Sequence, residues 1–389
     1  MKKIKVGIIG CGSIADIAHF PSIDKYPETE LVAVCDTDKK RAMQAAMKWN
    51  AKKYFTSYTE IFDKSDLDAV VIATPNALHY EQALAAAEAG VHLLIEKPLA
   101  VTNKQAWDIV ESCKKAKVKL MVGCDRRFWL QNEYAKKLIG EGYIGKPVMG
   151  YASQYQHFFY YQDQLAKTDF RLKPELAGAA AIIDMGAHAI DLIIWLMGSE
   201  VKRVTGIAKR SAIPESYTPL DDAVWILMEH KNGMTSCVTV NRFSPVVTQT
   251  TGVYGTDGTI MTSSDATNPF QASPLAVYTN KDYEEDELPD IIKKYRYPEI
   301  WWAEDRVKHP IDKRWVSVYP PRESNYERMW KHFIECIIED KQPRVSGEDG
   351  AKALEVMCGT FQSMETNGWV DLPLKNEVLM PHYAKAIKK

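Results

Sequence analysis

The fold of this chain is decided by the stretch Ile4-Lys5-Val6-Gly7-Ile8-Ile9-Gly10-Cys11-Gly12-Ser13-Ile14-Ala15. Its apolar half predicts a short strand, and its second half has the glycine spacing of a phosphate-binding turn before a helix. Gly10 allows the tight turn, Gly12 lets backbone approach a pyrophosphate, and the small Ala15 lets the helix lie close to the sheet. We expect Gly10, Gly12, Ser13 and Ile14 to contact a dinucleotide.

A second apolar run, residues 30–35, ends in Asp36, which lies 21 residues after Ala15. At about this spacing a carboxylate accepts hydrogen bonds from the ribose hydroxyls of a dinucleotide. The same carboxylate about 4 Å from a 2′-phosphate costs on the order of 4 kcal/mol in a protein-like dielectric. We therefore expect NAD rather than NADP. Residues 39–41, Lys-Lys-Arg, either neutralise part of such a phosphate or form a solvated helix face.

The alternation of apolar strands and helices continues to residue 124. Strands are expected at 68–73, 91–95 and 119–123 and helices at 80–89 and 103–116, so residues 1–124 form a doubly wound α/β Rossmann domain. The connection Thr74-Pro75-Asn76-Ala77-Leu78-His79 places Thr74, Asn76 and His79 on the cofactor side of the sheet. A Pro-Asn turn with a capping residue is the alternative.

The tripeptide Glu96-Lys97-Pro98 follows the apolar run 91–95. Pro98 has no N–H to donate and favours an extended Lys97, so the strand ends there. Ligands of open α/β sheets bind beyond the carboxyl ends of the strands, which makes Lys97 a candidate for chemistry. A solvated lysine at a strand end is the plainer interpretation.

Beyond residue 124 the pattern changes to successive β-like runs. They cover residues 147–155, 201–209, 223–230, 235–242 and 253–262, without intervening helices. These runs predict a second, α+β domain over residues 125–389 with a large, mostly antiparallel sheet. Residues 325–340 and 347–367 have the pattern of two amphipathic helices.

Residues 181–195 have the composition of an apolar helix that carries three ionisable side chains. Asp184, His188 and Asp191 are spaced i, i+4 and i+7, which puts them on one face of one helix. Such groups are costly to bury without partners. They therefore either line a polar cavity or belong to a network in the core.

Length, charge and cysteine content predict a two-domain cytoplasmic protein that acts on small molecules. The 389 residues suffice for two domains of ordinary size. A formal net charge of -2 gives no footprint for nucleic acid or an anionic membrane, and no apolar run has the length of a signal peptide or a membrane helix. The 7 scattered cysteines contain no Cys-x-x-Cys pair, so we expect no disulfides and no metal.

Taken together, these motifs resemble those of the Gfo/Idh/MocA oxidoreductases, a family that includes glucose-fructose oxidoreductase and inositol dehydrogenases. The resemblance spans nearly the whole chain and rests on Gly10-Cys-Gly12-Ser-Ile-Ala15, Thr74-Pro75-Asn76 with His79, Glu96-Lys97-Pro98, Asp184-x-Gly186-x-His188-x-x-Asp191, Ser346-Gly347-Glu348-Asp349-Gly350 and Asp371-Leu372-Pro373.

The resemblance implies a Rossmann domain joined to an open-faced sheet, a final helix that returns to the first domain, and a homodimer or homotetramer formed through the sheet. It also implies hydride transfer between a sugar or polyol and nicotinamide. The family's lysine, aspartate and histidine map onto Lys97, Asp184 and His188. Residues 178–181, Gly-Ala-Ala-Ala, and the pair Phe170-Arg171 depart from the family pattern, which bears on the shape of the substrate.

Oxidation of a secondary alcohol needs a base within about 3 Å of the hydroxyl oxygen. A lysine starts near pKa 10.4, which would have to fall to about 7, whereas histidine starts near 6.5. We therefore assign His188 as the general base, Asp184 as the group that orients it or a hydroxyl, and Lys97 as the cation that stabilises the developing alkoxide. Glu96 is expected to orient Lys97. An NAD-dependent glycosidase with transient oxidation and a non-catalytic NAD-sensing regulator are the alternative functions.

Further substrate contacts, besides Asp184 and His188, are expected near the domain junction. Arg126 and Arg127 follow the strand expected at 119–123 and resemble a basic position of the family, with salt-bridged structure as the alternative. Tyr155 and His157 begin an aromatic cluster, completed by residues 158–161, that either stacks on a sugar ring or packs in a core. The irregular segment 281–322 is expected to be a solvated acidic loop followed by an aromatic flap or subunit contact.

Overall fold

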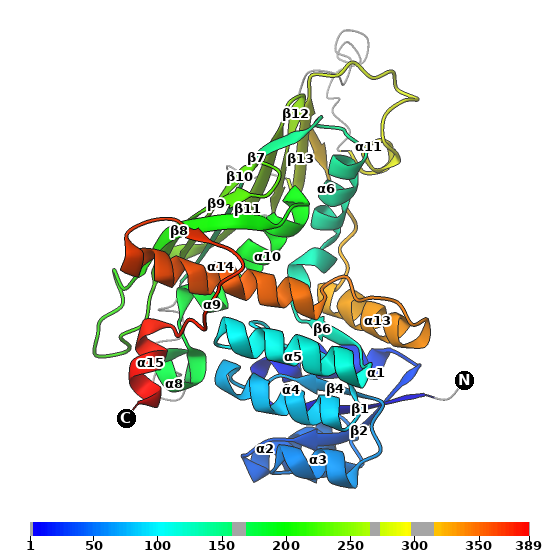
Figure 1. Ribbon diagram of the computed structural model, residues 1–389. Coiled ribbons are helices and arrows are strands. Elements are labelled where there is room, and N and C mark those ends of the chain that lie inside the picture. Colours follow the sequence, from blue (N-terminus) through cyan, green and yellow to red (C-terminus); the bar gives the residue numbers. More distant parts are fainter. Residues whose placement is uncertain (1–2, 158–168, 265–272, 297–314, 389) are drawn as a thin grey trace.

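The computed structural model describes residues 3–157, 169–264, 273–296 and 315–388. It contains a six-stranded sheet at one end of an elongated molecule and a nine-stranded sheet at the other (Figure 1). The first sheet ends at Val122, and the second begins at Pro147. The expected combination of a Rossmann domain with a large, mostly antiparallel sheet is confirmed.

All strands of the first sheet are parallel, in the order β3-β2-β1-β4-β5-β6. Their bounds are Ile4–Ile9 (β1), Thr29–Cys35 (β2), Lys53–Phe55 (β3), Ala69–Ile72 (β4), His92–Ile95 (β5) and Leu120–Val122 (β6). Parallel strands that are covered on both faces are continuously apolar, which is why the sequence predicts all of them except the short edge strand β3.

Helical segments cover both faces of this sheet (Figure 1). They are a π-helical turn η1 (Ala15–His19) continued by α1 (Phe20–Lys25), then α2 (Lys39–Lys48), α3 (Tyr58–Lys64), the 3-10 turn η2 (Asn76–Leu78), α4 (His79–Glu88) and α5 (Asn103–Ala116). α5 has the predicted bounds, and its first turn is capped by the Thr102 hydroxyl, which accepts from the N–H of Gln105. The carboxyl ends of the parallel strands meet at one edge, so the residues that follow them lie together.

The second sheet has the strand order β14-β13-β12-β11-β7-β10-β9-β8-β15. The bounds are Pro147–His157 (β7), Val201–Lys209 (β8), Ala223–His230 (β9), Thr235–Asn241 (β10), Phe243–Gly255 (β11), Gly258–Ser263 (β12), Leu275–Thr279 (β13), Val316–Val318 (β14) and Val370–Asp371 (β15). Only β7 and β10 pair in parallel among the described strands of this sheet. The single strand expected at 253–262 was wrong: Thr256 and Asp257 form a turn between β11 and β12, and the first part of β11 was not predicted.

The helical segments of the second domain are η3 (Asp125–Phe128), α6 (Leu130–Gly140), η5 (Phe170–Leu172), α8 (Pro174–Ala177), α9 (Ala181–Asp184), α10 (Gly186–Met197), α11 (Asp290–Tyr295), α13 (Asn325–Ile338), α14 (Gly347–Thr366) and α15 (Pro381–Ile387). α10 lies so close to β7 that a Cβ on Gly150 would be 2.8 Å from Ile193 and Met197. The single helix expected at 181–195 was also wrong, because the chain breaks at Met185 between α9 and α10.

α14 connects the two domains, since it packs against both β8 and α5 (Figure 1). It opens with a capping box in which Ser346 and Asp349 bond reciprocally to each other's backbone N–H. The chain after α14 also returns to the first domain, where Asn103 accepts from the N–H of Val378 at 2.8 Å. These contacts hold the two sheets in one arrangement around the site described below.

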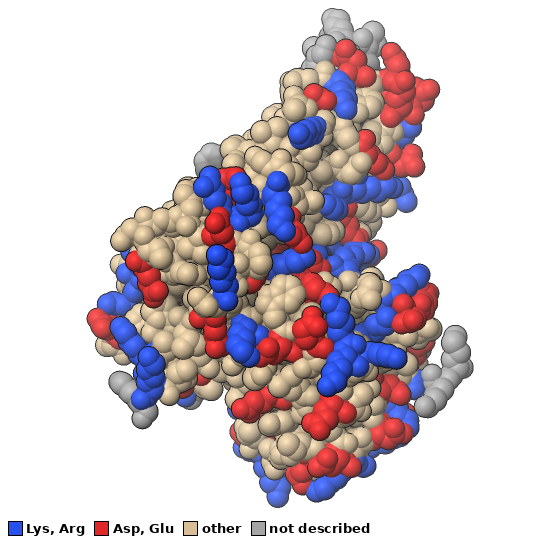
Figure 2. Space-filling view, viewed as in Figure 1, with Lys and Arg blue, Asp and Glu red and all other residues tan. Residues whose placement is uncertain are grey.

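The charged side chains of both signs are interspersed on the face of the molecule that Figure 2 shows. Within the described ranges, no single helix is long and apolar enough to cross a membrane. One bent pair, 174–184 with 186–197, meets the criteria of length and composition only. Most side chains of α10 in that pair are buried in the core.

Candidate active site

Lys97 and Asp184 meet beyond the carboxyl end of β5. The Lys97 ammonium donates to Asp184 Oδ1 at 2.8 Å and to the Asp184 backbone oxygen at 2.9 Å. The residues are 87 positions apart in the sequence, and their side chains are 14% and 13% exposed. Lys97 is therefore an ion-paired cation in a partly buried site, which favours the chemical interpretation over a solvated surface lysine.

Two further cations face the Asp184 carboxylate. Arg242 Nη2 lies 3.4 Å and Arg171 Nε lies 3.7 Å from Asp184 Oδ2. Burial alone would raise the pKa of Asp184, but Lys97 and the two guanidinium groups hold it far below its usual range. Asp184 is therefore an anion throughout the neutral pH range.

His188 lies on α10 and lines the same cavity as Lys97 and Asp184. Burial, together with the positive charges of Lys97 and Arg126, holds the pKa of His188 well below its ordinary value of 6.5. The imidazole is therefore neutral at pH 7. A neutral imidazole is the form that a general base requires.

Asp125 is a site residue that the sequence analysis missed. Its Oδ1 lies 3.2 Å from Nδ1 of His188, although neither atom has a partner with hydrogen-bond geometry in the described part of the chain. The other carboxylate oxygen accepts from Asn325 Nδ2 at 2.5 Å, across 200 positions of sequence. The available signal was its place just after the sixth strand, which is equivalent to that of Lys97 after the fifth.

Glu96 shapes the turn that carries Lys97. Its Oε1 lies 2.9 Å from His19 Nε2, and its Oε2 accepts from the backbone N–H of Lys97 at 3.2 Å. His19 belongs to the π-helical turn after the glycine loop, and π turns are frequent at functional sites. Glu96 therefore acts on the backbone of Lys97, whereas Asp184 holds its ammonium.

The glycine loop fits a dinucleotide. Gly10 has φ +95°, and a Cβ there would lie 2.5 Å from the backbone oxygen of Ala73, so only glycine is accommodated. A Cβ on Gly12 would meet no atom within 4 Å, and the side chain of Ser13 is exposed, so the outer side of the loop is open to a ligand. Ile14 lines a cavity of about 150 Å³ that continues from the loop to Lys97.

The connection after β4 contributes two side chains to this cavity. Thr74 and Asn76 line it, and the Asn76 amide donates to the backbone oxygen of Ala177 at 2.9 Å. His79 is fully buried, with its ring nitrogens 2.8 Å from the Pro98 oxygen and 2.9 Å from the Thr74 oxygen. His79 therefore fixes the backbone of the loop that begins at Thr74. We expect it to influence a bound cofactor through the position of this loop and not by direct contact.

Asp36 directly follows β2, beside the glycine loop, and is buried. Its carboxylate accepts from the N–H groups of Cys11 at 3.0 Å and Asp38 at 2.9 Å. Nη1 of Arg41 lies 3.3 Å from the same carboxylate. Arg41 is thus paired with Asp36, which anchors the loop at the place where the ribose is expected.

The two adjacent arginines have different surroundings. Arg126 donates to Gln249 and stacks 4.0 Å from the ring centroid of Trp129. It also lines a small space of about 20 Å³ beside His188, which we call the passage. Arg127 is 3% exposed and donates to both oxygens of Asp191, at 2.9 and 2.6 Å. Arg127 and Asp191 therefore form a core ion pair, and the expected substrate contact of Arg127 has no support in this geometry.

The first strand of the second sheet presents Gln154, not Tyr155, to the site. Gln154 lines the passage beside His188, and its amide donates to Met185 Sδ at 3.1 Å. Side chains alternate along a strand, so Tyr155 lies on the opposite face, where its hydroxyl is 2.8 Å from that of Thr239. His157 ends β7, but its side chain and residues 158–161 lie outside the described residues.

Comparisons with known proteins identify the family of this chain. Residues 4–124 match an oxidoreductase family with an NAD-binding Rossmann fold, and residues 132–261 match the GFO/IDH/MocA C-terminal domain. The chain belongs to the GFO/IDH/MocA oxidoreductase family. These matches confirm three expectations from the sequence: the family resemblance, the oxidoreductase class and the NAD-binding Rossmann domain.

Named relatives of this family member are sugar and polyol dehydrogenases. Over 376 residues the chain is 26% identical to the scyllo-inositol 2-dehydrogenase (NAD(+)) of Bacillus subtilis, covering 96% of this chain and 97% of that protein. It is also 26% identical over 380 residues to the D-apiose dehydrogenase of Paraburkholderia graminis, covering 96% and 90%. A solved structure of levoglucosan dehydrogenase with NADH and levoglucosan matches the fold with a TM-score of 0.78 at 23% identity, covering 96% of this chain and 100% of that one.

Proposed function

We propose that this protein is an NAD-dependent dehydrogenase that oxidises a secondary hydroxyl of a sugar, sugar derivative or polyol. The observation that carries the proposal is the convergence of an ion-paired Lys97, an anionic Asp184 and a neutral His188 in one cavity at the cofactor edge of the sheet. The sugar and polyol dehydrogenases among the relatives support the substrate class. When bound, NAD supplies the hydride acceptor.

His188 takes the proton of the reacting hydroxyl. Its low pKa makes it a weak base, but the positive field that lowers this pKa also stabilises the alkoxide that forms. Lys97 supplies much of that field, and Asp184 fixes the position of its ammonium. Lys97 therefore lowers the base strength of His188 and stabilises the alkoxide at the same time.

Asp125 positions the base. Its carboxylate faces Nδ1 of His188, which leaves Nε2 for the substrate. A small rotation of the imidazole would bring Nδ1–H into line with the carboxylate oxygen. Asp125 would then hold the tautomer in which Nε2 can accept a proton, while Asn325 holds Asp125.

The proposal is tested by assaying polyols, aldoses and glycosides for NADH absorbance with the wild-type protein and three variants. We expect Lys97→Met and His188→Asn to bind NAD normally, measured by fluorescence titration, and to lose turnover by about 10²-fold or more, since each removes a group that acts on the reacting hydroxyl. Lys115→Met, at an exposed lysine on α5, is the matched control and should keep full turnover.

Other outcomes would point elsewhere. Retained turnover in Lys97→Met would contradict the role of the lysine, and an unchanged rate and pH profile in His188→Asn would place the base on another residue. Release of free sugar from glycosides without accumulation of NADH would favour the glycosidase. NAD binding without turnover of any substrate would favour the regulator.

We also propose that the protein forms a homodimer or homotetramer through the open face of the second sheet. Ile207, Trp225 and Leu227 point outward from β8 and β9 and are 51%, 49% and 53% exposed. Ile207 and Trp225 are direct neighbours across the two strands. Contiguous exposed apolar side chains of this size are typical of a protein–protein interface.

A further inference from the structure

We propose that a second, larger cavity beside the candidate active site binds the outer unit of an extended substrate. The preferred substrate is then a glycoside or oligosaccharide, whose terminal ring is oxidised next to Lys97 and His188. This inference rests on the proposed function and specifies its substrate class. We call the second cavity the outer cavity; it has a volume of about 450 Å³, compared with about 150 Å³ for the cavity at Lys97.

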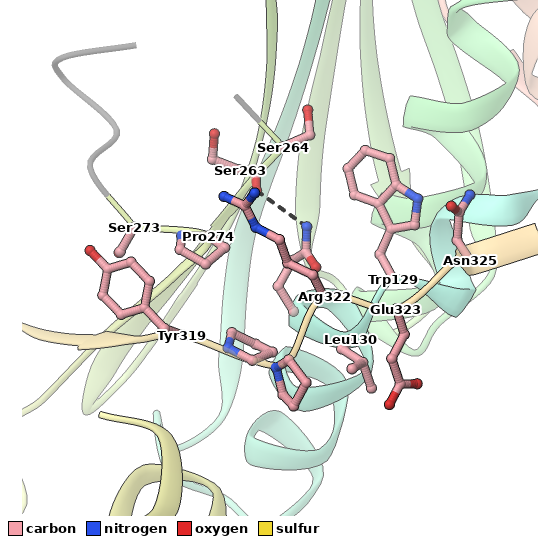
Figure 3. A pocket seen from close by; sticks show the side chains of 13 residues that line it. Trp129, Leu130, Ser263, Ser264, Ser273, Pro274, Tyr319, Arg322, Glu323 and Asn325 are labelled. Carbon is pink, nitrogen blue, oxygen red and sulfur yellow. Dashed lines mark hydrogen bonds between the residues drawn. The ribbon is translucent and has the colours of Figure 1, made fainter. Parts of the chain in front are cut away.

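The outer cavity lies at the far edge of the large sheet. Its walls come from the end of β12, the start of β13, the segment between β14 and α13, and the residues that begin α6. Figure 3 shows Tyr319 and Trp129 at opposite sides, with Arg322 between them and Ser263 and Ser264 nearby. Four segments that are far apart in the sequence therefore form the outer cavity. It is a feature of the tertiary structure and not a depression in a single surface loop.

The passage, a small space of about 20 Å³, shares lining residues with the outer cavity and with the cavity at Lys97. Trp129, Ser263 and Ser264 line both the outer cavity and the passage. His188 lines both the passage and the cavity at Lys97. A space of this volume holds about one water-sized group, so it fits a glycosidic linkage but not a sugar ring.

The walls of the outer cavity suit a saccharide. The Trp129 and Tyr319 rings and two prolines, Pro320 and Pro321, supply flat apolar surface. The hydroxyls of Ser264 and Ser273 donate to Gln249 and to the Leu275 backbone oxygen, so toward a ligand they act as acceptors. Arg322 adds a donor for which we find no ion pair in the part of the chain that the structure describes. Glu323, the carboxylate in this wall, is already engaged by Arg328 at 2.6 Å. The mixture of apolar planes and neutral or donating groups fits the alternating faces and hydroxyls of a sugar ring.

The outer cavity is also connected to the base. Asn325 lines it and donates to Asp125, whose other carboxylate oxygen faces His188. Trp129, on the other side, packs on Arg126 at 4.0 Å. An outer sugar unit would therefore contact two residues that touch the surroundings of His188, so its binding is expected to raise kcat/KM for the inner ring.

The test compares each free monosaccharide or polyol that is oxidised with its own glycosides and disaccharides, by NADH formation. With the wild-type protein we expect kcat/KM to be at least 10-fold higher for the extended form. Ser273→Trp fills the outer cavity from a position away from the catalytic residues, and should reduce this advantage to less than twofold while leaving the free sugar unchanged. Ser211→Trp, at an exposed serine elsewhere, is the matched control and should retain the advantage.

Tyr319→Ala provides a second variant in case the tryptophan disturbs folding, and should raise KM for the extended substrates only. Equal kcat/KM for free and extended forms in the wild-type protein, or an advantage that survives in both Ser273→Trp and Tyr319→Ala, would overturn the outer subsite and leave the proposed function standing. If neither free nor extended sugars are oxidised, the proposed function itself fails, and the subsite with it.

Discussion

Lys97 influences the ionisation of two neighbouring residues in ways that the proposed reaction needs. Burial raises the pKa of Asp184, and Lys97 is the nearby charge that lowers it most. Asp184 therefore stays an anion and can hold the Lys97 ammonium. For His188, burial comes first and Lys97 second, and both lower the pKa of the imidazole. At the scale of single residues, Lys97 therefore favours the anionic form of Asp184 and the neutral form of His188.

The pH dependence of kcat/KM follows from the depressed pKa of His188. The base must be neutral, so activity rises with pH through the His188 pKa and is lost as pH falls below it. We expect this acid limb to lie below pH 6.5, the ordinary value for the group, in assays at saturating NAD. Arg126→Gln removes one of the cations and should move the limb upward. An acid limb at or above pH 6.5 in the wild-type protein would be inconsistent with a buried His188 as base.

Asp125→Asn tests the positioning of the base. The amide preserves the shape of the side chain, and its oxygen keeps the hydrogen bond from Asn325. Its NH₂ group then faces Nδ1 of His188, which favours the tautomer with the proton on Nε2 and removes the acceptor that the base needs. We expect kcat to fall on the order of 10²-fold, as for a misplaced catalytic group, with KM changed little. Steady-state kinetics at several pH values measure this. A change confined to KM would instead assign Asp125 to substrate binding.

At the scale of secondary-structure elements, the local path of the backbone determines which side chains enter the site. The break at Met185 separates Asp184, at the end of α9, from His188 and Asp191 on α10. Asp184 and His188 line the cavity, whereas Asp191 lies in the core with Arg127. The alternation of β7 selects Gln154 over its neighbour Tyr155. Neither choice requires a change of residue type; each follows from the local path of the backbone.

The Arg127–Asp191 pair joins η3 to α10 and should be essential for stability. Both side chains are almost fully buried, so Arg127→Met leaves an uncompensated carboxylate in the core. We expect a loss of about 3–5 kcal/mol in the free energy of unfolding, measured by urea denaturation. The double variant Arg127→Met/Asp191→Leu should recover much of that loss, and Lys104→Met, which breaks an exposed pair on α5, should change stability little. A single-variant loss no larger than that of Lys104→Met would show that the pair is dispensable.

At the scale of the whole molecule, the second sheet has one face packed by helices and one face with exposed apolar side chains. The packed face supports the site through α10, and α14 ties the sheet to the Rossmann domain. The open face carries Ile207, Trp225 and Leu227, whose exposure in a single chain is unfavourable in water. Assembly through this face would bury them without disturbing the site.

Trp225→Glu combined with Leu227→Glu is expected to dissociate the oligomer, because two charges would have to be buried in an apolar interface. Sedimentation velocity should show a dimer or tetramer for the wild-type protein and a monomer for the double variant. Met47→Glu, at an exposed apolar residue on α2, is the control and should assemble normally. Persistence of the oligomer in the double variant would place the interface elsewhere.

The sequence by itself determined the features that depend on neighbouring residues. The glycine spacing after β1, the acid at the end of β2, the bounds of α5 and the proline that ends the strand before Lys97 all follow from local backbone geometry and from continuous burial of parallel strands. The sequence also predicted that Asp184 and His188 lie close together, and both line one cavity although the chain breaks between them. These are the parts of the fold and of the candidate site that could be predicted.

Only the tertiary structure decided which of these residues meet. It placed Asp125 beside His188, paired Arg127 with Asp191, turned Gln154 inward, and assembled the outer cavity from four segments. Contacts between residues such as Asp125 and Asn325, 200 positions apart, depend on how strands and helices pack across the molecule. Residue type and local spacing do not predict such long-range contacts. Whether a charged side chain is buried and which partner it has depend on the groups that the folded chain brings next to it.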